Sequence, residues 1–92
     1  MITDRVAAHP DVLLTSMKDG TGVLLNVKTK FYYTLNETGC FAWKQLEKAK
    51  EGLPVAELAK RVNATYAVGL ETAESDLRAL VKELVAEGLL VA

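Results

Sequence analysis

The order of apolar patterns along the chain predicts an α+β domain, in which a three-stranded antiparallel sheet is followed by three helices. Two observations support this class. Three short segments within residues 11–35 are rich in apolar and β-branched side chains and are joined by short connections. Residues 37–87 then carry apolar side chains at helical spacing. The 92 residues are expected to form one domain, 1–92, with a single core.

The three predicted strands cover residues 11–16, 22–27 and 31–35. The first two are apolar and partly β-branched, and the third is mostly aromatic, which favours a strand. Asp19 and Gly20 lie in the first connection, where glycine reaches the positive φ of a tight turn without a steric cost. Because both connections are short, neighbouring strands are expected to run antiparallel.

The three predicted helices cover residues 37–48, 54–65 and 70–87. Asn36 is a good N-cap for the first helix, since its side-chain oxygen can accept from a free backbone N–H of the first turn. Pro54 fits the first turn of the second helix, where the missing N–H costs nothing.

Glycine and an apolar stripe define the ends and the inner face of these helices. Gly52 is expected to end the first helix. Beyond the third helix, Leu89, Leu90 and Val91 form a short apolar tail that is expected to dock on the domain. The inner face of the third helix shows the strongest periodicity in the chain and comprises Ala73, Leu77, Leu80, Val81, Leu84 and Val85.

Two residues of the first helix are assigned to the core. Trp43 lies on the inner face, and its truncation is expected to cost on the order of 3–5 kcal/mol. Cys40 is interpreted as a small buried apolar residue because no histidine follows it in the chain.

Composition excludes several classes of function. The net charge of −1 does not favour a phosphate backbone or an anionic membrane as partner. No apolar run approaches the roughly 20 residues of a transmembrane helix. Residues 1–11 lack the pattern of a signal peptide, and one cysteine cannot form an internal disulfide. These features lead us to expect a cytoplasmic location with no membrane partner.

Catalysis is also not expected. The chain has a single histidine, His9, and a single cysteine, and it lacks a glycine-rich phosphate loop and the spacing of metal ligands. Hydrolysis or group transfer requires one of these constellations. We therefore expect a protein that is not an enzyme and that has no metal site and no cofactor.

The third strand is the strongest candidate for a binding site. Its aromatic, uncharged residues would form an edge that invites aggregation unless another strand pairs with it. Since the faces of a strand alternate, Phe31, Tyr33 and Leu35 are expected to point one way and Tyr32 and Thr34 the other. On the third helix, Ala79 is small enough to admit a ligand side chain, while Arg78, Lys82 and Glu83 could rim a groove.

An ordered set of segments across residues 6–91 carries a resemblance to a known family. The set comprises Leu25-Asn26-Val27, Tyr32-Tyr33-Thr34-Leu35-Asn36-Glu37-Thr38-Gly39, Trp43, Val55-Ala56-Glu57-Leu58, Tyr66, Asp76-Leu77 and Gly88-Leu89-Leu90. In this order and spacing the segments resemble the PqqD-like family of peptide chaperones, also called precursor-peptide recognition elements. The chain departs from the family at Lys30, where a glycine often closes the hairpin.

The resemblance implies a fold similar to a winged helix-turn-helix and a non-catalytic binding module. Such modules capture the leader of a ribosomally synthesised precursor peptide and present it to a modifying enzyme, such as a radical SAM enzyme or a peptidase. The leader adds as a strand beside the third strand, in a groove walled by the third helix. The expected peptide-binding residues are Phe31, Tyr32, Tyr33, Thr34, Leu35, Asp76, Ala79, Leu80, Lys82 and Glu83.

Two other functions are compatible with this architecture. A winged-helix domain can bind nucleic acid, but residues 70–87 hold two basic residues against five acidic ones, a net charge of −3 that would repel DNA. We therefore expect no nucleic-acid partner. The second alternative is a general protein–protein adaptor, which the sequence leaves open.

Overall fold

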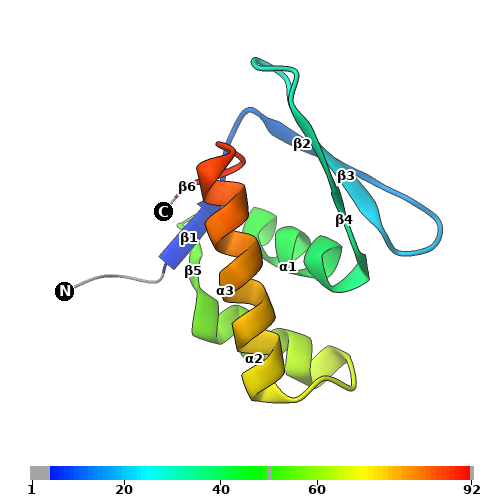
Figure 1. Cartoon of the computed structure of the whole chain (residues 1–92), viewed down its shortest axis with the longest axis vertical. Coiled ribbons are helices and arrows are strands. Elements are labelled where there is room, and N and C mark those ends of the chain that lie inside the picture. The colour runs from blue at the N-terminus through cyan, green and yellow to red at the C-terminus, as the bar shows by residue number, and fades with distance from the viewer. Residues whose placement is uncertain (1–4, 50, 92) are drawn as a thin grey trace.

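The computed structural model describes residues 5–49 and 51–91 (Figure 1). The predicted α+β class, with three antiparallel strands followed by three helices, is confirmed, and each predicted element agrees with the structure to within one residue at either end. In chain order the elements are β1 Arg5–Ala8, β2 Val12–Ser16, β3 Gly22–Asn26, β4 Tyr32–Leu35, α1 Glu37–Lys48, β5 Leu53–Pro54, α2 Val55–Thr65, α3 Leu70–Ala86 and β6 Leu90–Val91.

The larger sheet has the strand order β2-β3-β4 and consists of two hairpins. It lies at one end of the molecule, beside α1 and away from α2 (Figure 1). Gly22 begins β3, and a Cβ there would stand 2.7 Å from Leu14 Cδ1 and 3.0 Å from the Cys40 sulfur. A side chain at this position would therefore have to displace one of these two side chains.

The second hairpin turns through a non-glycine residue in the left-handed region. Lys30 has φ 67°, and its N–H donates to the Asn26 carbonyl at 2.8 Å. The Asn26 side chain also holds the turn, since Oδ1 accepts from the N–H groups of Lys28 and Thr29. A left-handed conformation costs an L-residue about 1–2 kcal/mol, which glycine at this position avoids.

A second small sheet, in the order β5-β1-β6, was not predicted from the sequence. Its central strand pairs antiparallel with β5 through Arg5↔Pro54 and with β6 through Ala8↔Leu90. The pairing fixes the apolar tail, whose Leu89 is fully buried. β5 and β6 have two residues each, too few to show a periodicity, and without them β1 has no partner strand that a sequence pattern could reveal.

Three predicted element ends are corrected by the structure. Pro54 is the N-cap residue and not part of the first turn of α2, because its extended backbone (φ −66°, ψ 147°) pairs with β1. Gly52 does not end α1, which stops at Lys48 with Ala49 as its C-cap. Instead, Gly52 forms the following turn at φ 84°, where a Cβ would come 2.4 Å from the Val6 carbonyl oxygen. Phe31 precedes β4, which begins at Tyr32.

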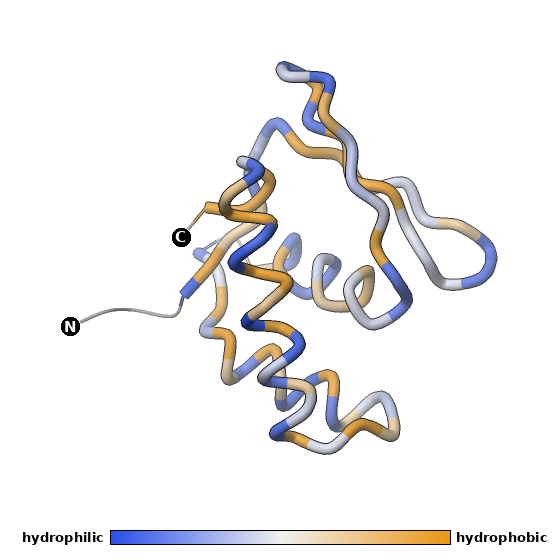
Figure 2. Tube along the Cα trace, viewed as in Figure 1, coloured by the Kyte–Doolittle hydropathy of each residue, from blue (hydrophilic) through white to orange (hydrophobic). Residues whose placement is uncertain are grey.

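The core lies mainly among the three helices and the small sheet, and Val12, Leu24 and Leu35 extend it to the larger sheet. Trp43 is 1% exposed and Cys40 is also buried, so both core assignments are confirmed. Apolar and polar residues alternate along α2 and α3 at helical spacing (Figure 2). On α3, Ala73, Leu77 and Leu84 are buried, and Leu80, Val81 and Val85 pack against them at the margin of the core.

Candidate functional site

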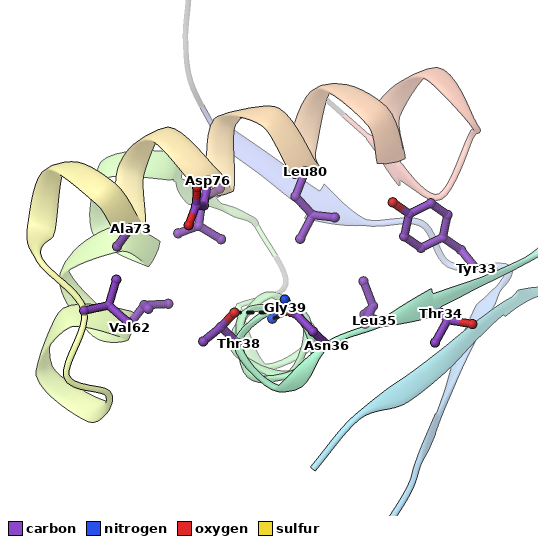
Figure 3. Close-up of a pocket in the computed structure, with 12 residues that line it drawn as sticks. Tyr33, Thr34, Leu35, Asn36, Thr38, Gly39, Val62, Ala73, Asp76 and Leu80 are labelled. Carbon is purple, nitrogen blue, oxygen red and sulfur yellow. Dashed lines mark hydrogen bonds between the residues drawn. The ribbon is translucent and has the colours of Figure 1, made fainter. Parts of the chain in front are cut away.

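A pocket of about 330 Å³ opens between the end of β4, the first turn of α1 and α3 (Figure 3). Leu35, Leu77 and Leu80 contribute apolar side chains to its lining, whereas Thr34, Thr38 and Asp76 contribute polar groups. Its full lining is Tyr33, Thr34, Leu35, Asn36, Thr38, Gly39, Val62, Val68, Ala73, Asp76, Leu77 and Leu80.

The turn from β4 into α1 shapes one wall of this pocket. Asn36 caps α1 as predicted: its Oδ1 accepts from the Gly39 N–H at 2.8 Å and from the Thr38 hydroxyl at 3.2 Å. Gly39 leaves the wall without a side chain, and a Cβ there would lie 3.3 Å from Leu80 Cδ2. The capped turn and this glycine together bring α1 close to α3.

One edge of β4 is open along the pocket. In the hairpin, the Asn26 N–H donates to the Phe31 carbonyl at 2.9 Å, and the register continues through Leu24↔Tyr33 and Gly22↔Leu35. Backbone groups of successive residues point to opposite sides of a strand. The N–H and C=O groups of Tyr32 and Thr34 therefore point away from β3, and no strand within residues 5–49 and 51–91 pairs with them.

The side chains of β4 alternate as the sequence predicted. Leu35 is buried and Tyr33 half-buried on the face toward α3, while Tyr32 and Thr34 are exposed on the other face. Tyr32 has 68% of its surface exposed, and it lies beside Leu25 of β3, which in turn pairs with Leu13 of β2. An apolar row therefore crosses the outer face of the sheet and ends at the open edge.

Tyr33 links β4 to α3 at one end of the pocket. Its hydroxyl donates a hydrogen bond to the Glu83 carboxylate. This bond raises the pKa of Tyr33, and burial and the negative charges of Glu83 and Glu87 raise it further. This hydrogen bond joins β4 to α3 through two residues that lie 50 positions apart in the sequence.

A profile of the family described as coenzyme PQQ synthesis protein D (PqqD) matches residues 21–90. This span contains β3, β4, all three helices and every residue that lines the pocket. The chain belongs to the PqqD family. No curated protein matches the sequence.

Two solved structures are similar to this PqqD-family chain over nearly its whole length. One is described as TbiB1 in complex with the TbiA(beta) leader peptide; it is 30% identical, with a TM-score of 0.77 over 91% of this chain and 93% of the other. The second is described as lasso peptide synthetase B1 complexed with the leader peptide; it is 25% identical, with a TM-score of 0.76 over 96% of this chain and 99% of the other.

The predicted site residues fall into two groups. Tyr33, Thr34, Leu35, Asp76 and Leu80 line the pocket, and Glu83 reaches its margin through Tyr33. The other four lie outside the lining: Phe31 at the hairpin, Tyr32 on the outer face, and Ala79 and Lys82 exposed on α3.

Seven residues of the pocket were not among the predicted site residues, namely Asn36, Thr38, Gly39, Val62, Val68, Ala73 and Leu77. The first three belong to the segment Leu35-Asn36-Glu37-Thr38-Gly39, on which the family resemblance partly rests. That motif could have indicated these three residues as part of the site. The apolar residues looked like ordinary core positions, and only the packing of α2 against α3 places them at a cavity.

Among residues 5–49 and 51–91, no three histidine, cysteine or acidic side chains gather where they could hold a metal ion. Within the same ranges, none of the helices combines the length and the apolar character needed to cross a bilayer.

Proposed function

We propose that this PqqD-family protein captures the leader of a ribosomally synthesised precursor peptide as an added strand on β4, and presents it to a modifying enzyme without itself catalysing a reaction. The observation that carries the proposal is the open edge at Tyr32 and Thr34, which runs beside the pocket. Both similar structures are described as complexes with a leader peptide, which supports the same function here.

Strand addition fits the geometry of this edge. A new strand lies about 4.8 Å from its neighbour, and its backbone would meet the free N–H and C=O groups of Tyr32 and Thr34. Its side chains would alternate between the two faces of the sheet. Those on the face of Tyr33 and Leu35 would enter the pocket over Leu80, and the others would extend the outer row that ends at Tyr32.

The partner enzyme is proposed to be a radical SAM enzyme or a peptidase, the two classes that the family resemblance implies. A short precursor gene beside this gene, together with a gene of either class, would identify the pathway. We propose a cytoplasmic location, because a precursor peptide is available there as soon as it is translated.

Fluorescence anisotropy tests the proposal against nucleic-acid binding. The ligands are the synthetic leader of the precursor encoded beside this gene and a labelled random-sequence DNA duplex, both at physiological salt. We expect the leader to bind and the duplex not to bind, because α3 carries an excess of acidic residues. Salt-sensitive DNA binding with no leader binding would reverse the conclusion.

A further inference from the structure

The charged groups that border the groove are acidic. Asp76 is the one charged residue in the lining of the pocket. Leu80, Glu83 and Glu87 follow Asp76 at helical spacing, so these four residues share one side of α3. None of the ion pairs found among residues 5–49 and 51–91 involves Asp76, Glu83 or Glu87.

The basic residues of α3 do not neutralise the acidic side chains on this side of the helix. Arg78 forms an ion pair with Glu74, one turn before it, at 2.8 Å. Lys82 is exposed outside the pocket lining. The start of α1 contributes a partial positive charge, but the Asn36 side chain already accepts from the Gly39 N–H, and Glu37 stands in the first turn. A ligand in the groove therefore meets acidic groups beside the apolar side chains of the lining.

The contacts between β4 and α3 give the direction in which these two elements run relative to each other. Tyr33 meets Glu83, whereas Gly39, beyond the end of β4, lies next to Leu80. The two elements thus run in opposite directions past each other (Figure 3). An added strand pairs slightly more stably per residue when it is antiparallel than when it is parallel. A peptide added antiparallel to β4 would follow the direction of α3 and pass Asp76 before it reaches Leu80.

The spacing of these two residues matches the repeat of a strand. Asp76 and Leu80 are one helical turn apart, about 6 Å along the axis. Side chains two residues apart on one face of a strand are separated by about 6.7 Å. One ligand side chain can therefore enter the pocket at Leu80 while the side chain two positions earlier reaches the Asp76 carboxylate.

We infer that the groove selects a leader with lysine or arginine two residues before the apolar side chain that fills the pocket, and that Asp76 is the residue that recognises this basic group. The inference rests on the proposed function and names the chemistry of its ligand. The pocket and the open edge define the site, and the carboxylates determine the charge of the side chain that it accepts. An ionised carboxylate only accepts hydrogen bonds, which suits the donors of lysine and arginine.

A displayed library of random dodecapeptides, panned on the folded protein, tests this selectivity. We expect the wild type to enrich peptides with lysine or arginine two residues before an apolar residue. Asp76→Asn should weaken binding of the enriched peptide by roughly three- to tenfold, which corresponds to about one charge-assisted hydrogen bond at a partly exposed site. Glu71→Gln is the matched control, because Glu71 is an exposed carboxylate of α3 outside the pocket lining, and it should leave the affinity unchanged.

Charge reversal makes the test stricter. Panning on Asp76→Lys should enrich aspartate or glutamate at the position where the wild type enriches lysine or arginine. Peptides that protect the Tyr32 and Thr34 amides from exchange but show no basic preference would overturn the inference and leave the proposed function intact, as would equal effects of Asp76→Asn and Glu71→Gln. Enriched peptides that leave both amides unprotected would overturn the inference together with the proposed function.

Discussion

Thr34→Pro is the substitution that most selectively blocks the open edge of β4. Proline lacks an N–H and is tolerated on edge strands where that group faces solvent. The Thr34 N–H points away from β3, so the hydrogen bonds of the hairpin, which are made by Phe31, Tyr33 and Leu35, are retained. Tyr33 already has the extended backbone that a residue before proline prefers.

The expected loss of affinity follows from one missing hydrogen bond. A leader carbonyl that finds no N–H donor at residue 34 reduces the binding free energy by about 1–3 kcal/mol. This loss corresponds to roughly a five- to 150-fold increase in the dissociation constant. The cost to folding should stay near 1 kcal/mol, the span of strand propensities. Fluorescence anisotropy with the synthetic leader measures the first quantity, and urea unfolding measures the second.

Ser16→Pro is the matched control. Ser16 is exposed, and it pairs with Gly22, whose backbone groups point toward β4, so the Ser16 N–H faces the opposite open edge of the same sheet. This variant should bind the leader like the wild type. A folded Thr34→Pro protein with unchanged affinity, or an equal loss of affinity in both variants, would refute strand addition at β4.

Three further predictions concern side chains around this edge. Lys30→Gly should raise the free energy of unfolding, measured in urea, by about 1 kcal/mol, because Lys30 has φ 67°. Lys28→Gly in the same turn is the control and should not raise it. An equal rise in both variants would contradict the explanation. Ala79→Trp should weaken leader binding less than Thr34→Pro does, because Ala79 does not line the pocket; a larger loss in the anisotropy titration would place the leader over Ala79 instead. The raised pKa of Tyr33 means that the folded state holds the phenolic proton more tightly than the unfolded state. The resulting stability is present below about pH 10 and lost as the pH rises above it. Tyr33→Phe should reduce the fall in unfolding free energy between about pH 9 and pH 11, and an unchanged profile would show that the bond to Glu83 contributes nothing.

Local patterns predicted the main elements because each depends on near neighbours. The apolar repeat of residues 70–87 and the Asn36 cap require contacts within a few positions, and both were found as predicted. The small sheet depends on Arg5 meeting Pro54 and on Ala8 meeting Leu90, contacts between distant segments that no short pattern encodes. The same pairing keeps Pro54 extended and delays the start of α2.

The candidate site was predicted in part for the same reason. The aromatic, uncharged strand and the family resemblance together predicted the β4 edge as the binding surface. To predict the pocket, one must know how α3 is rotated about its own axis. The spacing of its apolar residues defines this rotation only coarsely. The bond between Tyr33 and Glu83 and the contact of Gly39 with Leu80 show which side of α3 faces β4, and Ala79 lies outside the lining found there.

Strand addition to β4 is tested most directly by amide hydrogen exchange of single residues with and without the synthetic leader. In the free protein, the amides of Tyr32 and Thr34 should exchange quickly, while that of Tyr33 is protected by β3. Leader binding should slow exchange at Tyr32 and Thr34 and leave Ser16, on the opposite edge, unchanged. A leader that binds without protecting Tyr32 and Thr34, or that protects α2 instead, would show that the peptide does not bind as a fourth strand of this sheet.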